Sequence, residues 1–159
     1  MRKFEKISYD QFSKDVCDDK ELYDSIELPK RSTKNSAGYD IRSLEHYILK
    51  PNESHIFKTG LKVLMNNDEV LYIYDRSSFG FKYDIMLSNS VGVIDCDFYN
   101  NPENEGHMGV KLLNLGKNEV EINIGDRIAQ GVFMKYLTVD NEEEVKLVRK
   151  GGLGSTERK

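Results

Sequence analysis

The 159-residue sequence lacks any long apolar run. No stretch approaches the roughly 18 apolar residues of a membrane-spanning helix, so no membrane partner is expected. The N-terminal segment MRKFEKISYDQ has basic residues without an apolar region behind them, and neither a signal peptide nor an anchor is expected. Basic blocks are also absent, since 23 basic and 27 acidic residues are interspersed and give a net charge of −4. This balance argues against nucleic acid as a partner.

Cysteine and histidine are scarce. The two cysteines, Cys17 and Cys96, lie far apart without CxxC spacing. Neither a disulfide framework nor a zinc site is therefore expected, and the cytoplasm is the predicted compartment. The three histidines show no metal-ligand spacing, and the sequence has no internal repeat. The length is that of one domain with a single core.

One helix is clearly signalled near the N-terminus. Ser8 and Gln11 fit the N-cap and N3 positions of a capping box. An apolar stripe at spacings of three and four residues follows, and the polar run 17–20 is predicted to end the helix. We interpret residues 1–24 as an N-terminal helical extension that packs on the main body.

From about Ser36 onward the sequence predicts short strands. Val120, Ile122 and Ile124 alternate with polar residues, which is typical of a half-buried strand. Other runs rich in β-forming residues, and the turn signals between them, recur at fairly regular intervals. The predicted fold is all-β: a sandwich, jelly roll or small barrel. The runs are 56–58, 70–74 and 110–113, and the turns are 51–52, 66–68, 116–118 and 125–126.

Two acids, Asp95 and Asp97, flank Cys96 between segments that look like strand. Strand alternation would place both carboxylates on one face. Such a pair can hold a magnesium ion or activate a water molecule. Two solvated acids on a strand edge would show the same pattern, so this motif alone leaves both interpretations open.

Two further segments suit phosphate groups. Arg76-Ser77-Ser78 offers a guanidinium and two hydroxyls, although a surface turn has the same composition. The glycine-rich segment 151–156 can wrap around an anion with its backbone N–H groups. It lacks the spacing of a Walker A loop, and without a ligand we expect a mobile tail.

The order of these segments resembles the trimeric dUTP diphosphatase (dUTPase) family, which has five short motifs. The motifs are SAGYDI at 36–41, RSSFG at 76–80, NSVGVIDCDF at 89–98, GDRIAQ at 125–130 and GGLGST at 151–156. The resemblance implies a homotrimer of dUTPase-like jelly-roll or β-clip domains, each spanning residues 25–148. It also implies a flexible C-terminal arm at 149–159 that closes the active site. The implied reaction is Mg²⁺-dependent hydrolysis of dUTP to dUMP and pyrophosphate, which supplies dUMP for thymidylate synthesis.

The resemblance also assigns roles to residues at matching positions. It implies that Asp95 deprotonates the water that attacks the α-phosphorus, and that the ring of Phe98 packs beneath the deoxyribose. Asp40 would hold magnesium through water, and Leu153 would cap the base. Contacts with uracil or deoxyribose fall on Asn89, Gly92, Val93, Ile94 and Met108, as well as on Phe98. Phosphate contacts fall on Arg76, Ser77, Ser78, Gln130, Arg149 or Lys150, Gly154, Ser155 and Thr156.

The sequence departs from the family pattern at several positions, including Glu157 in place of a glycine and Arg149-Lys150 directly before the glycines of the last motif. Phe98 and Leu153 replace the usual tyrosine and phenylalanine, and seven residues, 99–105, stand where the family has one. We interpret 99–105 as a hairpin-tip insertion and a candidate docking element for a protein partner. One alternative is therefore a regulatory binding module. Another is dCTP deaminase, which shares the fold, although the strand 110–114 lacks the glutamate that those enzymes carry.

Overall fold

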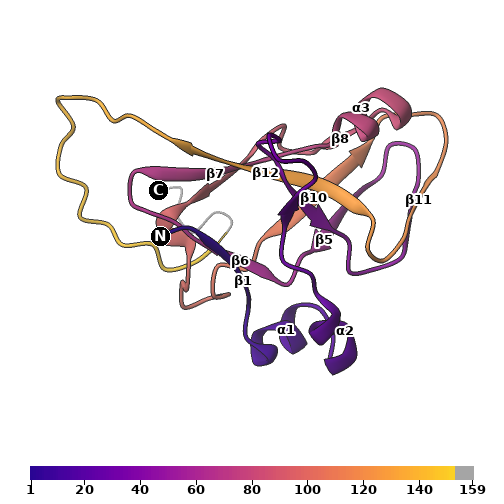
Figure 1. Ribbon diagram of the computed structural model, residues 1–159, viewed down its shortest axis with the longest axis horizontal. Coiled ribbons are helices and arrows are strands. Elements are labelled where there is room, and N and C mark those ends of the chain that lie inside the picture. Colours follow the sequence, from indigo (N-terminus) through magenta and orange to yellow (C-terminus); the bar gives the residue numbers. More distant parts are fainter. Residues whose placement is uncertain (153–159) are drawn as a thin grey trace.

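The computed structural model describes residues 1–152, and the regular secondary structure of this part of the chain is mainly antiparallel β (Figure 1). The predictions for Leu153, Gly154, Ser155 and Thr156 lie outside the described residues. The helices are α1 (Tyr9–Asp15), α2 (Lys20–Ser25), α3 (Ser77–Tyr83) and the 3-10 helix η1 (Cys96–Phe98). The strands are β1 (Lys3–Lys6), β2 (Lys30–Arg31), β3 (Tyr39–Arg42), β4 (Tyr47–Leu49), β5 (Ser54–Lys58), β6 (Leu61–Leu64), β7 (Glu69–Tyr74), β8 (Ile85–Leu87), β9 (Gly92–Asp95), β10 (Gly109–Asn114), β11 (Val120–Ile122) and β12 (Arg127–Lys135).

The strands form one large sheet and three small ones. The large sheet has the order β2-β3-β12-β7-β9, and a second sheet has the order β5-β10-β8. β1 pairs with β6, and β11 pairs with β4. The mostly β fold predicted from the sequence is confirmed, with helices α1 and α2 together on one side of the β body (Figure 1).

The first 24 residues are more than the single helix expected from the sequence. They contain β1, α1 and most of α2, because the short strand β1 is recognisable only from its pairing with β6. Ile7 and Phe12 are fully buried and join the same core as Phe57 and Leu112. The segment therefore contributes to the core of the β body.

Most local predictions agree with the structure, and three do not. Ser8 is the N-cap of α1, and its hydroxyl accepts the N–H of Gln11 at 3.1 Å. The predicted reciprocal contact of the capping box, from the N–H of Ser8 to the side chain of Gln11, is wrong, because that N–H donates to Glu105. Ile124 is 60% exposed, since β11 ends at Ile122. The strand expected through Phe98 ends at Asp95, where the chain turns into η1.

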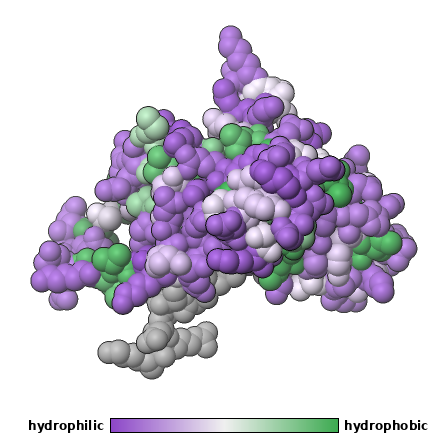
Figure 2. All heavy atoms as spheres, turned by 90° about the horizontal axis from the view of Figure 1, so that it is seen from below, coloured by the Kyte–Doolittle hydropathy of each residue, from purple (hydrophilic) through white to green (hydrophobic). Residues whose placement is uncertain are grey.

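The face shown in Figure 2 is mostly hydrophilic, with separate apolar patches. Within residues 1–152, no helix combines the length and the apolar character that crossing a membrane requires. Both cysteines are free thiols.

Candidate active site

Three of the five motifs meet on the large sheet. β12 lies between β3 and β7, and its register places Gln130 opposite Asp40 on one side and opposite Tyr74 on the other. Arg76 lies two residues after the end of β7 and is the N-cap residue of α3. We call Asp40, Arg76, Gln130 and the adjacent Ser77 and Ser78 the Arg76 half-site.

Asp40 fixes the guanidinium of Arg76. The Asp40 side chain is only 13% exposed, and its Oδ1 lies 3.2 Å from Nε of Arg76. Its Oδ2 accepts the hydroxyl of Ser32 at 2.5 Å and lies 3.4 Å from Nη1 of Arg127. A largely buried ion pair of this kind is costly to break, because one partner would be left uncompensated. Since a guanidinium has five N–H donors, the contact through Nε is compatible with an anion on the Nη groups of Arg76.

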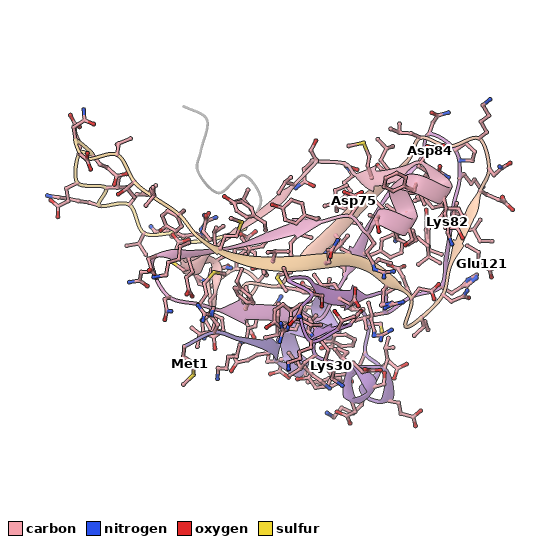
Figure 3. The ribbon with its side chains drawn as sticks, turned by 45° about the horizontal axis from the view of Figure 1, so that its top comes forward. Met1, Lys30, Asp75, Lys82, Asp84 and Glu121 are labelled. Carbon is pink, nitrogen blue, oxygen red and sulfur yellow. The ribbon has the colours of Figure 1, made fainter. Side chains whose placement is uncertain are left out.

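Gln130 reaches the same place through a gap left by a glycine. Its Nε2 donates to the carbonyl oxygen of Asp75 at 3.2 Å. Asp75 lies where β7 leads into α3 (Figure 3). A Cβ on Gly38 would lie 2.2 Å from Oε1 of Gln130. The glycine of the SAGYDI motif is therefore required for the side chain of Gln130 to take this position.

The third motif lies at the far edge of the large sheet. β9 pairs with β7, with Gly92 opposite Ile73 and Asp95 opposite Val70. Asn89 is exposed in the preceding turn, and Val93 is 56% exposed. With Ile94, Asp95 and Phe98 these residues form what we call the Asp95 half-site, and most of them are accessible to a ligand.

Met108, which the resemblance assigns to contacts with uracil or deoxyribose, is buried in this chain. It is 2% exposed, its N–H donates to the carbonyl oxygen of Leu61, and its own carbonyl oxygen accepts the hydroxyl of Thr59. Its side chain and its backbone polar groups are thus engaged inside the chain. In this conformation Met108 belongs to the core and adds no exposed group to the Asp95 half-site.

The described part of the C-terminal arm returns to the Asp95 half-site. Nη2 of Arg149 donates to Oδ2 of Asp95 at 2.5 Å, and its Nε donates to Oδ1 of Asp97 at 2.7 Å. The guanidinium carbon lies 5.9 Å from the centre of the Phe98 ring. The N–H of Gly152 donates to Glu103 at 2.7 Å. Arg149 thus contacts both carboxylates of the DCD motif, whereas Lys150 is exposed.

The two half-sites of one chain are far apart. Asp95 pairs with the second residue of β7, whereas Arg76 lies two residues beyond its end. At about 3.3 Å per residue, the six residues from Val70 to Arg76 correspond to roughly 20 Å. The residues predicted to contact a single substrate are therefore divided between two places in the chain.

No protein-built metal cage is found in residues 1–152, because they contain no group of three or more His, Cys, Asp or Glu side chains that could hold a metal ion. Magnesium prefers six oxygen ligands and usually keeps several waters or substrate phosphate oxygens among them. Both oxygens of Asp40 have other partners. This donor set fits only an ion that brings most of its ligands with it.

Residues that sequence reasoning missed lie behind the Asp95 half-site. Asn101 is 4% exposed and organises the 99–105 loop through hydrogen bonds to Phe98, Glu103 and Asn104. Glu105 contacts Ser8 and Lys62. The loop is therefore largely bonded within its own chain. No sequence signal pointed to the contact between Glu105 and Ser8, because Gln11 at the N3 position was expected to accept the N–H of Ser8.

An all-β domain with a carboxylate half-site and an arginine half-site suits a substrate that carries phosphate groups. Comparison with known proteins identifies the class. The dUTPase family model matches residues 24–157, and the chain belongs to the dUTPase family. The predicted family and enzyme class are thereby confirmed.

Individual relatives agree with this assignment. The chain is 52% identical over 132 residues to deoxyuridine 5'-triphosphate nucleotidohydrolase of Lactococcus lactis, covering 82% of this chain and 88% of that protein. The structure of dUTPase from Streptococcus mutans is 40% identical, with a TM-score of 0.72 and coverage of 87% and 99%. A mutant dUTPase from phage phi11 of S. aureus, described with a structural Mg(II) ion, shares the fold at 21% identity, with a TM-score of 0.67 and coverage of 92% and 97%.

Proposed function

We propose that this protein hydrolyses dUTP to dUMP and pyrophosphate, and thereby removes dUTP and supplies dUMP for thymidylate synthesis. The observation that carries the proposal is Asp95 itself. In a chain of the dUTPase family, Asp95 stands half-exposed at the end of β9, one turn from the ring of Phe98. A carboxylate in that position can orient and deprotonate a water molecule beside a bound nucleotide.

In the proposed reaction, different residues activate water, bind the base and bind the phosphates. Asp95 accepts a proton from the water that attacks the α-phosphorus, and pyrophosphate leaves. Asn89 and the backbone of β9 form hydrogen bonds with the edge of uracil. If another base binds, some of these protein groups are left without a partner, and that base is therefore disfavoured. Arg76, Ser77 and Gln130 bind phosphate oxygens. Phosphoryl transfer depends mainly on such charge neutralisation and positioning.

The active protein is proposed to be a homotrimer, as the family resemblance implies, and the separation of the two half-sites within one chain supports a site shared between copies. A second copy would bring its Arg76 half-site to the Asp95 half-site of the first. Coexpression of Asp95→Asn and Arg76→Ala chains tests this, since each variant alone lacks one half-site. Restored activity in mixed oligomers supports sites shared between copies. Mixtures as inactive as either variant would reject that arrangement.

Magnesium would supply charge neutralisation of the triphosphate when bound. The donor set favours an ion carried by the phosphate oxygens, with Asp40 reached through water. The Mg(II) of the phage phi11 protein makes this cation a reasonable choice to test.

Product analysis of the purified protein tests the activity. dUTP, dCTP, dTTP and UTP are each incubated with and without magnesium, and nucleotides and pyrophosphate are quantified. We expect dUMP and pyrophosphate from dUTP alone, dependent on the metal. Deamination of dCTP would favour the sister branch of the fold, and inactivity on all four would favour a regulatory binding module.

A further inference from the structure

Helix α1 holds the segment 105–107, which follows the third motif and the 99–105 loop, at two points. The N–H and the hydroxyl of Ser8, at the start of the helix, both donate to the carboxylate of Glu105, at 2.9 and 2.5 Å. At its last residue, Asp15 accepts a hydrogen bond from Nδ1 of His107 at 2.6 Å. The two ends of one seven-residue helix thus hold two residues that are separated only by Gly106.

The contact between His107 and Asp15 has a defined chemical form. The imidazole is 1% exposed, and the backbone N–H of Gly60 donates to its Nε2 at 2.9 Å. Because Nε2 accepts, Nδ1 carries the proton and donates to Asp15. Burial lowers the pKa of His107, although Asp15 opposes this. Burial alone would raise the pKa of Asp15, but hydrogen bonds from His107 and Gln11 outweigh it and lower that pKa. The pair is a neutral imidazole and a carboxylate.

Gly106, held on both sides, lies directly against the backbone of Phe98. A Cβ on Gly106 would lie 2.6 Å from the carbonyl oxygen of Phe98. The same oxygen accepts the backbone N–H of Asn101 at 3.3 Å and its side-chain Nδ2 at 2.9 Å. The position of Phe98 therefore depends on residues 105–107, and α1 holds those residues in place.

We infer that α1 fixes the position of Phe98, whose ring would form the floor of the deoxyribose site. Asp15 and His107 are positioning residues that act on Phe98 through Gly106, and we call this role of α1 the brace. The inference rests on the proposed function, in which the Phe98 ring packs beneath the deoxyribose. A ring in that place excludes a ribose 2′-hydroxyl by contact, so its position determines selectivity for dUTP over UTP. Asp15 and His107 do not touch the substrate.

Three variants of the full-length protein test the brace. Asp15→Ala removes the acceptor, Asp15→Asn keeps a carbonyl oxygen that can accept from Nδ1, and Asp10→Ala removes an exposed acid of the same helix as a control. We expect the dUTP-to-UTP ratio of kcat/KM to fall about tenfold in Asp15→Ala, because small displacements of a positioned group cost large factors in rate. The KM for dUTP should rise more than kcat falls. Asp15→Asn should restore most of the selectivity, and Asp10→Ala should match the wild type.

Two results would overturn the inference. One is an Asp15→Ala protein of lower thermal stability whose KM and selectivity equal those of the wild type, since α1 would then be structural only. The other is an Asp15→Asn protein as unselective as Asp15→Ala. If Asp15→Ala does not fold, Ser8→Ala tests the other end of α1 at an exposed position, with the same expectation and the same refutation.

A spectroscopic measurement separates the brace from the proposed function. Fluorine-labelled phenylalanine places a reporter at each of the seven phenylalanines, and the Phe98 signal is identified by its loss in Phe98→Leu. We expect the Phe98 signal to shift in Asp15→Ala but not in Asp10→Ala, and an unchanged signal would overturn the inference. If the wild-type protein does not hydrolyse dUTP, the proposed function is rejected. The fluorine signal of Phe98 would still show whether Asp15 affects the position of Phe98.

Discussion

Replacing Gly106 by alanine should destabilise the protein more than the same change at Gly125. Both glycines have positive φ, +82° and +87°, which costs an L-residue roughly 1–2 kcal/mol. They differ in their surroundings. A Cβ on Gly106 meets the Phe98 carbonyl oxygen at 2.6 Å, whereas a Cβ on Gly125 meets nothing within 4 Å. Because the obstacle at Gly106 is backbone, relief requires the loop to move, and such overpacking adds about 1–3 kcal/mol.

The stabilities of the two variants can be compared by thermal unfolding at one protein concentration, since oligomers unfold in a concentration-dependent way. The restriction of the unfolded chain by alanine is the same in both and cancels. A difference of about 2 kcal/mol corresponds to roughly 4–8 °C in Tm for a chain of this length. Gly106→Ala should also reduce selectivity for dUTP over UTP, and Gly125→Ala should not. Equal losses of Tm in the two variants would refute the packing argument.

Three further predictions concern the reaction and its pH limits. Asp95→Asn should lower kcat by about 10²–10⁴-fold and keep binding of a non-hydrolysable dUTP analogue, as measured by calorimetry; near-normal turnover would mean that another group is the base. Deleting residues 149–159 should reduce kcat/KM and leave the oligomer intact in size-exclusion chromatography, and a monomer would contradict this. The free energy of unfolding should fall as the pH drops below 6.5, the ordinary pKa of a histidine. Below that pH the unfolded chain binds a proton at His107, whereas burial lowers the pKa of His107 in the folded chain and keeps it neutral. His107→Gln should flatten this dependence in denaturant titrations, and an unchanged slope would exclude His107 as its source.

Local patterns predicted the strands well because their signals lie within a few residues. The β-forming run of β7 and the alternation at Val120 and Ile122 needed no long-range information. The bulge in β12 did not follow from its pattern. There the register shifts between Arg127 and Ala129, so Ile128 and Ala129 are both buried although they are neighbours. Such a shift depends on the partner strand β3.

The candidate site was predictable as a set of residue types, but its spatial arrangement was not. The motif order indicated Asp95, Arg76 and Gln130. That Asp40 pairs with Arg76 depends on strand register, which decides the neighbours of each side chain. The contact between Asp15 and His107 spans 92 residues and leaves no trace in either local segment.

The strand order explains why one chain can carry the motifs of the family without forming a complete site. β12 pairs with both β3 and β7, so the Arg76 half-site assembles at the end of β7. β9 is antiparallel to β7, and each residue from Gly92 to Asp95 takes the chain farther from Arg76. A longer β9 would increase the separation, and the sheet twist cannot remove a gap of roughly 20 Å along one strand. The register of β9 on β7 thus separates Asp95 from Arg76 of the same chain, which is the reason the proposed site takes the two residues from different copies.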